Sequence, residues 1–408
     1  MDALSELPTR WTRLLRPLSV ALDFTYQGLS LHHLRVARAA DSLARALSLP
    51  LAAREQLAAA ALVHDIGALT FEEKEALHRF EVEEPFAHAA RGAAFLHSVP
   101  GLEKVADIVL CHHDRWSGPN QSSLEGEAIP WESRVIHLCD RLDVLLDYRR
   151  NVLDQAEGVL KALASESGRL FDPRLTRELE RLARAPAFWL DLVVPEPWLS
   201  GDEMGGDAYQ DNGVPLPELA AMLARLVDSK SPFTHRHSAG VAVAAATGAA
   251  LLGFDAEGVQ RARMAGLLHD LGKLSVPEAV LNKPGPLDRR ELNLVRGHSY
   301  YTYRILCRIP ETREIAAWAG YHHERLDGRG YPFGLAAPEI DTGARLLAAA
   351  DVFVALVEDR PYRASLPRAG VEAVMREAVR SGALDAAAVD VLLGSCDELI
   401  GRLRRLGH

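Results

Sequence analysis

Residues 267–272 read Leu-Leu-His-Asp-Leu-Gly, and residues 62–67 read Leu-Val-His-Asp-Ile-Gly. In each stretch a histidine–aspartate pair, His64-Asp65 or His269-Asp270, follows a run of apolar residues at helical spacing. We therefore expect each pair near the end of a buried helix that is followed by a glycine. A repeated segment of this kind determines the interpretation of the whole chain, because it predicts two copies of one domain.

Further histidines and aspartates surround both pairs in the same order. A histidine stands 32 residues before each pair, a lone histidine follows the pair, a His-His pair begins 24 residues later, and an aspartate closes the set 28 or 29 residues after that. The first set comprises His32, His64, Asp65, His88, His112, His113 and Asp140. The second set comprises His237, His269, Asp270, His298, His322, His323 and Asp351. The constant spacing predicts two equivalent sites.

The segment between the two copies has a different composition. Residues 195–218 are rich in Pro, Gly, Asp and Asn, which is typical of a linker. We expect one domain over residues 1–194 and another over 219–408, with a helix beginning near Pro217. Ala, Leu and Arg are abundant and β-branched runs are scarce, so the predicted fold class is all-α, with two tandem helical bundles.

Charge and cysteine content limit the class of protein. The formal net charge is -10, which argues against binding of long nucleic acid but allows a small nucleotide held by local basic residues. Four scattered cysteines predict a reducing, cytoplasmic environment. No signal pattern opens the chain, and the longest apolar stretch, residues 241–254, is too short to span a bilayer, so we expect no membrane association.

Each set of five histidines and two aspartates suggests metal binding. Burial of unpaired ionised groups costs several kcal/mol each, and a metal ion removes that cost. Mixed imidazole and carboxylate ligands suit first-row ions such as iron, manganese or zinc. Two ions about 3.5–4 Å apart could share Asp270 and keep positions for water and substrate. On a helix, His322 and His323 would point about 100° apart and could serve different ions.

The second copy also carries more specific motifs. They are Lys273, Asn282-Lys283-Pro284-Gly285, His322-His323-Glu324-Arg325, Gly330-Tyr331-Pro332 and Asp359-Arg360-Pro361-Tyr362-Arg363. From about residue 225 to the C-terminus the chain resembles the HD-GYP family of the HD superfamily. Its members hydrolyse cyclic dinucleotides, chiefly cyclic di-GMP and in some cases 3′,3′-cyclic GMP-AMP.

The resemblance implies roles for these residues. The second set would hold two divalent ions, iron or manganese, and a hydroxide bridging them would attack phosphorus and open cyclic di-GMP to linear pGpG. Asp270 and Lys273 would be catalytic, with Lys273 contacting the scissile phosphate. Substrate binding is implied for Lys273, Gly330, Tyr331, Pro332, Arg360 and Arg363. Phe233 stands where some members carry a third-metal glutamate, so we expect two metals and a linear product.

The first copy keeps its seven histidines and aspartates but lacks the substrate motifs. Ala68 replaces the lysine, and residues 119–122 read Pro-Asn-Gln-Ser without a Gly-Tyr-Pro. It could be a regulatory or dimerising partner with a second, vestigial metal site, a second enzyme for another phosphoester, or a nucleotide-binding module. A homodimer and a regulatory contact between the two domains remain open.

Two other functions for the whole chain stay open from the sequence. One is hydrolysis of other nucleotides, such as deoxynucleoside triphosphates or alarmones, as in HD relatives. The other is a non-catalytic cyclic dinucleotide sensor. The Gly330-Tyr331-Pro332 loop argues against the first, and Lys273 with a complete set of ligands argues against the second. The residues do not distinguish cyclic di-GMP from cyclic GMP-AMP.

Overall fold

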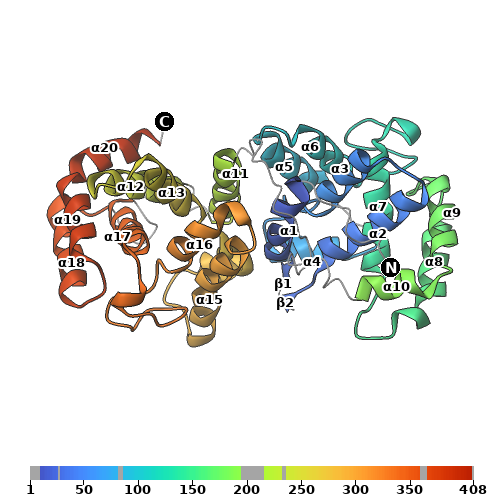
Figure 1. The fold of residues 1–408 in the computed structure, drawn as a ribbon. Coiled ribbons are helices and arrows are strands. Elements are labelled where there is room, and N and C mark those ends of the chain that lie inside the picture. The colour runs from blue at the N-terminus through green and yellow to red at the C-terminus, as the bar shows by residue number, and fades with distance from the viewer. Residues whose placement is uncertain are drawn as a thin grey trace. The chain divides into compact units, whose positions relative to one another are not determined.

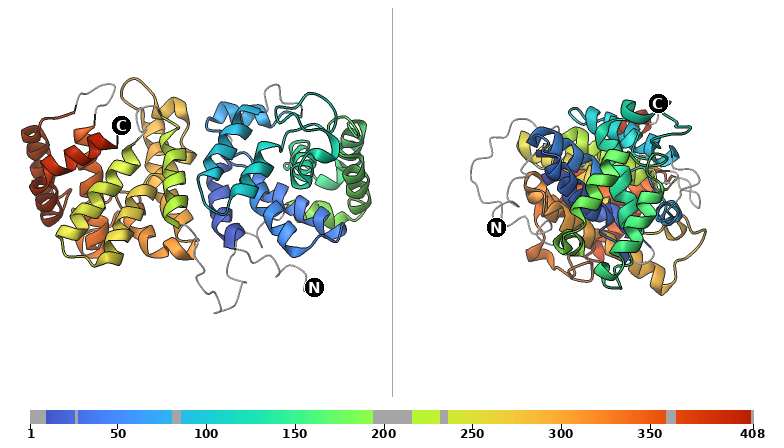
Figure 2. Two further views of the ribbon diagram at one scale, coloured as in Figure 1. Left: turned by 90° about the horizontal axis from the view of Figure 1, so that it is seen from above. Right: turned by 90° about the vertical axis from the view of Figure 1, so that its right-hand side faces the viewer.

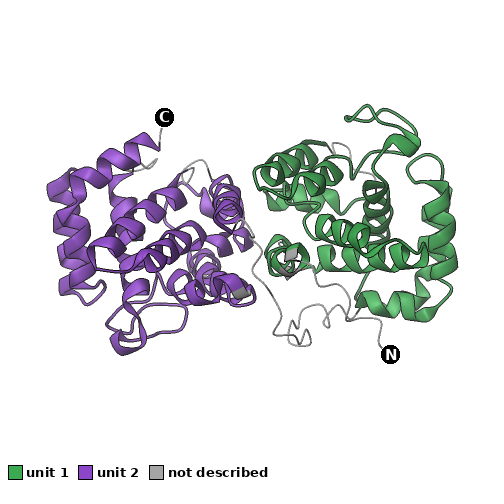
Figure 3. Ribbon diagram, turned by 45° about the horizontal axis from the view of Figure 1, so that its top comes forward, with its two compact units in different colours: residues 1–215 green, residues 216–408 purple. Residues whose placement is uncertain are grey.

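The computed structural model describes residues 10–25, 28–80, 86–193, 216–231, 236–358 and 365–406. The chain divides into two compact units, residues 1–215 (unit 1) and 216–408 (unit 2), which Figure 3 colours separately. Helices build both units (Figure 1), which confirms the predicted all-α class. The exception is a two-residue antiparallel pair, β1 (Phe24–Thr25) with β2 (Gly28–Leu29), which is too short to give a sequence signal.

In its described residues, unit 1 contains α-helices, two short 3₁₀ helices and the β1–β2 pair. Its helices are α1 (Arg10–Leu22), α2 (His32–Ala46), α3 (Leu51–Ala61), α4 (Phe71–Leu77), α5 (Phe86–His97), α6 (Glu103–Leu110), η1 (Gly126–Ala128), α7 (Trp131–Val144), η2 (Val152–Asp154), α8 (Ala156–Ser165), α9 (Pro173–Leu182) and α10 (Pro186–Val193).

Unit 2 repeats this order of the main helices. Its helices are α11 (Leu216–Asp228), α12 (His237–Leu251), α13 (Ala256–Leu268), η5 (Leu271–Ser275), α14 (Glu278–Leu281), α15 (Arg289–Leu306), η6 (Pro310–Thr312), α16 (Arg313–Gly320), η7 (Ala337–Glu339), α17 (Thr342–Val357), α18 (Arg368–Arg380), α19 (Ala386–Gly394) and α20 (Cys396–Arg405).

The two units use equivalent helices in equivalent ways. Helices α2, α3, α5, α6 and α7 of unit 1 correspond to α12, α13, α15, α16 and α17 of unit 2 by the residues that they carry. In unit 1, α8 and α9 pack on each other and on α7, and in unit 2, α18 and α19 pack on each other and on α17 (Figures 1 and 2). The repeat in the sequence is therefore also a repeat of helix packing.

Two glycines allow the central helices of unit 2 to approach closely. A Cβ at Gly266 on α13 would lie 2.5 Å from the Cα of Ala242 on α12, and a Cβ at Gly272 would lie 1.9 Å from the carbonyl oxygen of His298 on α15. Gly67 in unit 1 meets the carbonyl oxygen of His88 in the same way, at 2.0 Å. The glycine after each His-Asp pair thus brings that pair against the helix that supplies the next histidine.

The helix expected near Pro217 is present, but it begins inside the last three residues of the expected linker. The linker was expected to reach residue 218, but α11 begins at Leu216. Pro217 fits the first turn of a helix, because backbone N–H groups in that turn have no intrahelical acceptor and a proline there loses no hydrogen bond. The helix can therefore start before it. Residues 194–215 of the expected linker lie outside the described residues. Within the described ranges, no helix is both long and apolar enough to cross a membrane.

Candidate metal centres

The structure brings the seven predicted ligands of unit 2 together from five places. His237 opens α12, His269 and Asp270 follow α13, His298 lies on α15, and Asp351 lies on α17. His322 and His323 lie in the turn after α16 rather than on a helix, with ring centroids 4.0 Å apart. The expectation that these two point about 100° apart on a helix was wrong, because α16 ends at Gly320.

The ligands form two groups that meet at Asp270. His298, His322 and His323 form one group, and His237, His269 and Asp351 form the other; within each group the ligand atoms lie within 4.8 Å of one another. Asp270 turns one oxygen to each group. Its Oδ2 is 3.2 Å from His269 Nε2, and its Oδ1 is 3.4 Å from His298 Nε2. The arrangement fits two cations that share one carboxylate.

The protonation of the imidazoles is determined by their second nitrogens. The Nδ1 atoms of His269, His298 and His322 donate to the carbonyl oxygens three residues earlier, at 2.8, 2.5 and 2.6 Å. Only an N–H can donate to a carbonyl, so each neutral ring keeps its lone pair on Nε2. Yet His298 Nε2 and His322 Nε2 are 3.2 Å apart. Two facing lone pairs repel each other, and a cation between them removes the repulsion.

The charges around these ligands also favour a cation. Burial lowers the pKa of His298 to about 3, although Asp270 opposes the shift, and burial together with His323 lowers the pKa of His322 well below its usual value. Both rings therefore stay neutral and able to coordinate near pH 7. Burial raises the pKa of Asp270, but His269 and Lys273 lower it more, so the carboxylate stays ionised. The donor set fits a divalent first-row metal.

His237 differs from the other imidazoles of unit 2. Its Nε2 is 3.0 Å from Asp351 Oδ1, and its Nδ1 is 3.0 Å from Glu358 Oε2. Burial lowers its pKa, but the hydrogen bonds with Asp351 and Glu358 outweigh burial and raise the pKa to about 10, so an ion bound at Nε2 would displace a proton from this ring. Glu358 lies seven residues after Asp351, and a metal-ligating histidine commonly has such an outer carboxylate. We did not identify Glu358 from the sequence, although this spacing equals two helical turns.

Lys273 and Tyr331 lie at the edge of the same group of side chains. Lys273 Nζ donates to Asp270 Oδ2 at 2.5 Å, and its side chain is 20% exposed. The ring centroids of Tyr331 and His323 are 4.8 Å apart, and the guanidinium carbon of Arg296 lies over the Tyr331 ring, 5.6 Å from its centroid. Burial and Asp351 raise the pKa of Tyr331 to about 12, so its hydroxyl stays a donor near neutral pH. Phe233, Arg360 and Arg363 lie outside the described residues.

Glu324 attaches the loop with Gly330-Tyr331-Pro332 to the metal ligands. Its buried carboxylate accepts hydrogen bonds from the backbone N–H groups of Phe333 (2.7 Å), Gly334 (3.2 Å) and Leu335 (3.0 Å). The N–H of Tyr331 also donates to the carbonyl oxygen of His323, at 3.2 Å. Sequence reasoning noted Glu324 only as part of a motif, because its partners lie nine to eleven residues away on an irregular loop.

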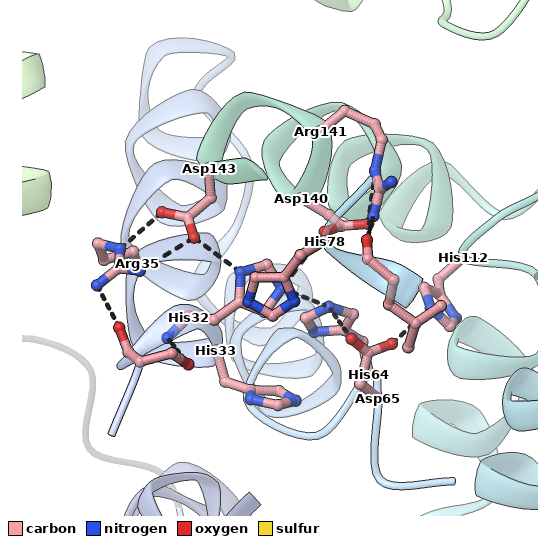
Figure 4. A network of polar contacts seen from close by, with 12 residues as sticks. His32, His33, Arg35, His64, Asp65, His78, His112, Asp140, Arg141 and Asp143 are labelled. Atoms are coloured by element: carbon pink, nitrogen blue, oxygen red, sulfur yellow. Dashed lines mark hydrogen bonds and ion pairs between the residues drawn. The ribbon is translucent and has the colours of Figure 1, made fainter. Parts of the chain in front are cut away.

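Unit 1 contains a second set of the same design (Figure 4). Asp65, His88, His112 and His113 form one group, and His32, His64 and Asp140 form another. Asp65 Oδ1 faces His88 Nε2 at 3.1 Å, and Asp65 Oδ2 faces His64 Nε2 at 3.5 Å. The Nδ1 atoms of His64 and His112 donate to carbonyl oxygens, while His88 Nε2 and His112 Nε2 lie 3.3 Å apart. This donor set fits a metal for the same reason.

The surroundings of the unit 1 ligands differ from those of unit 2. Arg141 is 2% exposed and donates to Asp140 Oδ2 at 2.7 Å and to the carbonyl oxygen of Leu77 at 3.0 Å. Val352 stands at the equivalent position of unit 2, directly after Asp351. Ala68 is buried at the position of Lys273. In unit 1 a buried guanidinium therefore neutralises part of a ligand carboxylate, and no lysine is available there for a substrate.

Known proteins match both units. Two models described as HD domain match residues 221–387 and 30–145. The 3′3′-cGAMP-specific phosphodiesterase 1 of Vibrio cholerae is 32% identical over 372 residues, which are 89% of this chain and 86% of the relative. The 3′3′-cGAMP-specific phosphodiesterase 3 of the same organism is 36% identical over 294 residues, which are 70% of this chain and 62% of the relative.

A shorter sequence match and a solved structure add to these. The cyclic di-GMP phosphodiesterase PA4108 of Pseudomonas aeruginosa is 40% identical over 173 residues, 41% of this chain and 40% of the relative. A crystal structure of a cyclic GMP-AMP-specific phosphodiesterase from V. cholerae has a TM-score of 0.65 at 26% identity, and the match covers 95% of this chain and 97% of that one. The last match extends over both units.

Proposed function

Because the chain belongs to the HD-GYP family of HD-domain phosphodiesterases, we propose that unit 2 is a metal-dependent phosphodiesterase that opens a cyclic dinucleotide to its linear form. One observation carries the proposal. Imidazole lone pairs and ionised carboxylates converge at Asp270, with the amine of Lys273 and the hydroxyl-bearing ring of Tyr331 beside them. Metal ligands next to a cation and a hydrogen-bond donor suit a phosphodiester.

We assign one divalent ion to His237, His269 and Asp351 and a second to His298, His322 and His323, with Asp270 shared. Iron or manganese suits these ligands. When bound, the two ions supply positive charge for the phosphoryl oxygens and lower the pKa of a coordinated water. Asp270 holds the two groups together, since each of its oxygens faces one of them. The ligand side chains hold and space the two ions, and the ions supply the Lewis acidity.

The protein's own side chains bind and orient the substrate in this proposal. Lys273 is partly exposed and can pass from Asp270 to a phosphoryl oxygen of the scissile phosphate. Tyr331 stays protonated and donates a hydrogen bond to the nucleotide. Gly330 and Pro332 shape the loop that carries Tyr331, and Glu324 holds that loop in place. We assign Arg360 and Arg363 to substrate phosphates, on the resemblance alone.

The lengths of the matches bear on which cyclic dinucleotide is cleaved. Matches of 372 and 294 residues are longer than either unit and must reach into both, and these two relatives are named for 3′3′-cGAMP. The match to the cyclic di-GMP enzyme PA4108 spans 173 residues and can lie within one unit. We therefore place 3′,3′-cyclic GMP-AMP beside cyclic di-GMP as a substrate, although the family resemblance by itself implied chiefly cyclic di-GMP.

The decisive experiment uses the full chain purified without oxygen and analysed for metal. It is incubated with cyclic di-GMP and with 3′,3′-cyclic GMP-AMP in parallel, and the products are separated. We expect at least one ring to open to a linear dinucleotide, and the ratio of the two kcat/KM values names the substrate. A metal-loaded protein that binds both compounds and opens neither would contradict the proposal and favour a sensor.

Replacing Glu324 with glutamine is expected to raise KM about tenfold with a smaller change in kcat. A glutamine has the same size, but its amide N–H₂ would face backbone N–H groups that now donate to Glu324, which costs about 1–3 kcal/mol for an unpaired buried donor. The nucleotide-binding loop then loses its fixed position. Initial rates at varied substrate concentration measure the change.

Glu339→Gln is the matched control for Glu324→Gln. Glu339 also accepts a backbone N–H, from Ala336 at 3.0 Å, but it is exposed. We expect its KM to stay within about twofold of the original, since exposed hydrogen bonds contribute little. Equal KM values for both variants would mean that Glu324 does not position the loop.

For unit 1 we propose a metal-binding domain without phosphodiesterase activity, which supports unit 2 as a regulatory or dimerising partner. Its ligands converge as they do in unit 2. The lysine that would contact a phosphate is replaced by buried Ala68, and Arg141 takes up one oxygen of Asp140. These differences affect substrate binding and leave most of the metal ligands in place.

A further inference from the structure

Unit 1 carries an imidazole beside its metal ligands at a position where unit 2 carries a hydroxyl. His33 follows the ligand His32, whereas Ser238 follows the equivalent ligand His237. An aspartate stands ten residues before each of them, Asp23 before His33 and Asp228 before Ser238. At this position the two units therefore carry different side chains, each ten residues after an aspartate.

The geometry of His33 leaves its Nε2 aimed at the other ligands. Its Nδ1 and backbone N–H both donate to Asp23 Oδ1, at 2.6 and 3.2 Å, so the lone pair of the neutral ring is on Nε2. His33 is 3% exposed, and its Nε2 has no hydrogen-bond partner among the described residues. The rings of His33 and His64 are 4.8 Å apart (Figure 4). Ligand atoms of His33, His64 and Asp65 lie within 4.8 Å of one another.

Ser238 in unit 2 keeps the aspartate contact but offers no such ligand. Its hydroxyl donates to Asp228 Oδ1 at 2.8 Å, and its N–H donates to Asp228 Oδ2 at 3.3 Å. The hydroxyl is thus directed to Asp228, as His33 Nδ1 is directed to Asp23. The side chains differ only beyond that contact, where the imidazole extends to His64 and Asp65.

If His33 only formed a buried hydrogen-bonded pair with Asp23, that pair would explain the contact of Nδ1 but not the position of Nε2. It would leave Nε2 as an unsatisfied buried acceptor, and such atoms are rare in native proteins because losing their hydrogen bonds to water costs free energy. A metal ion at His64 and Asp65 satisfies this nitrogen. The carboxylate on the far side of the ring is the usual outer partner of a metal-ligating histidine.

We propose that His33 Nε2 is a metal ligand specific to unit 1, and that it completes the coordination of the ion held by His32, His64, Asp65 and Asp140. The inference rests on the proposed metal site of unit 1. Structural metal sites have their coordination filled by protein ligands, whereas catalytic sites keep positions for water and substrate. With His33 present, unit 1 holds a structural ion, and with Ser238 in its place, unit 2 keeps a position for chemistry.

The test is the rate of metal release from the full chain loaded with Mn²⁺. We compare the original protein with His33→Ser, which copies the residue of unit 2 and can keep the contact to Asp23, and with His33→Asn, which keeps a donor near Nδ1 but not Nε2. After a chelator is added, we expect the release of the unit 1 ion to be about tenfold or more faster in both variants, since even changes in outer ligands alter metal affinity 10–100-fold. Asp65→Ala identifies the fraction of metal that unit 1 holds.

Each result decides a separate point. Release from both His33 variants at the original rate would overturn the role of His33. A metal content in Asp65→Ala equal to that of the original protein would overturn the unit 1 site itself, and with it this inference. Metal release needs no turnover, so a failure here is distinguishable from a failure of the phosphodiesterase assay. Ser238→Ala is the control. It removes the side-chain contact with Asp228 in unit 2 but removes no metal ligand, so it measures the effect of losing the aspartate contact alone.

Discussion

Replacing Asp270 with alanine is expected to abolish opening of the cyclic dinucleotide, with kcat falling by at least about 10³-fold, or about 4 kcal/mol in the barrier. Asp270 is the only ligand in our assignment that faces both groups, through Oδ1 toward His298 and Oδ2 toward His269. Without it the two ions lose their shared carboxylate, and the buried site loses a negative charge that offsets theirs. Product separation and metal analysis on the purified variant measure both losses.

Asp65→Ala is the matched variant in unit 1. Asp65 occupies the equivalent position and faces His64 and His88 in the same way. If unit 2 carries the activity, this variant keeps kcat within about threefold, a change of less than 1 kcal/mol. Loss of turnover in Asp65→Ala with full turnover in Asp270→Ala would assign the chemistry to unit 1 instead.

Replacing Lys273 with methionine is expected to lower kcat about 10²–10³-fold, the usual effect of removing one group that stabilises transition-state charge. The methionine keeps an unbranched side chain that is one heavy atom shorter, and it removes the ammonium that now donates to Asp270 at 2.5 Å. Metal content should stay unchanged, because Lys273 is not a metal ligand in our assignment. Initial rates with saturating substrate, alongside metal analysis, separate the two effects.

Lys273→Arg is the companion to Lys273→Met. It keeps a positive charge but replaces a compact ammonium with a planar guanidinium, so we expect only partial recovery of kcat. A rate for Lys273→Met close to the original would mean that the lysine only neutralises Asp270. A loss of rate in proportion to a loss of metal would assign it a structural role.

The helices and the ligand set were largely predictable from the sequence. The spacing of the apolar residues predicts helices that run into His64-Asp65 and His269-Asp270, and α3 and α13 end within three residues of these pairs. Each ligand also recurs in the second copy at a near-constant interval. Because helix periodicity is a local property, the residues alone determine which side chains share a buried face.

Several contacts at the sites could not be predicted in this way. His322 and His323 lie in a turn after α16, so the expectation that they lie on a helix was wrong. Arg141 reaches Asp140 and the carbonyl oxygen of Leu77, 64 residues away in the chain. His33 looked like a neighbour of the ligand His32, and its role depends on the approach of His64, which another helix carries.

The sequence by itself determined the two-copy organisation, the all-α class and the seven candidate ligands in each copy, because these depend on residue type and spacing along the chain. Only the tertiary structure decided how those ligands divide into two groups around Asp270, and which of the further residues Glu358, Glu324 and His33 approach them. The reason is physical: distances between helices depend on close packing, such as Gly266 against Ala242, and side chains far apart in sequence determine that packing together.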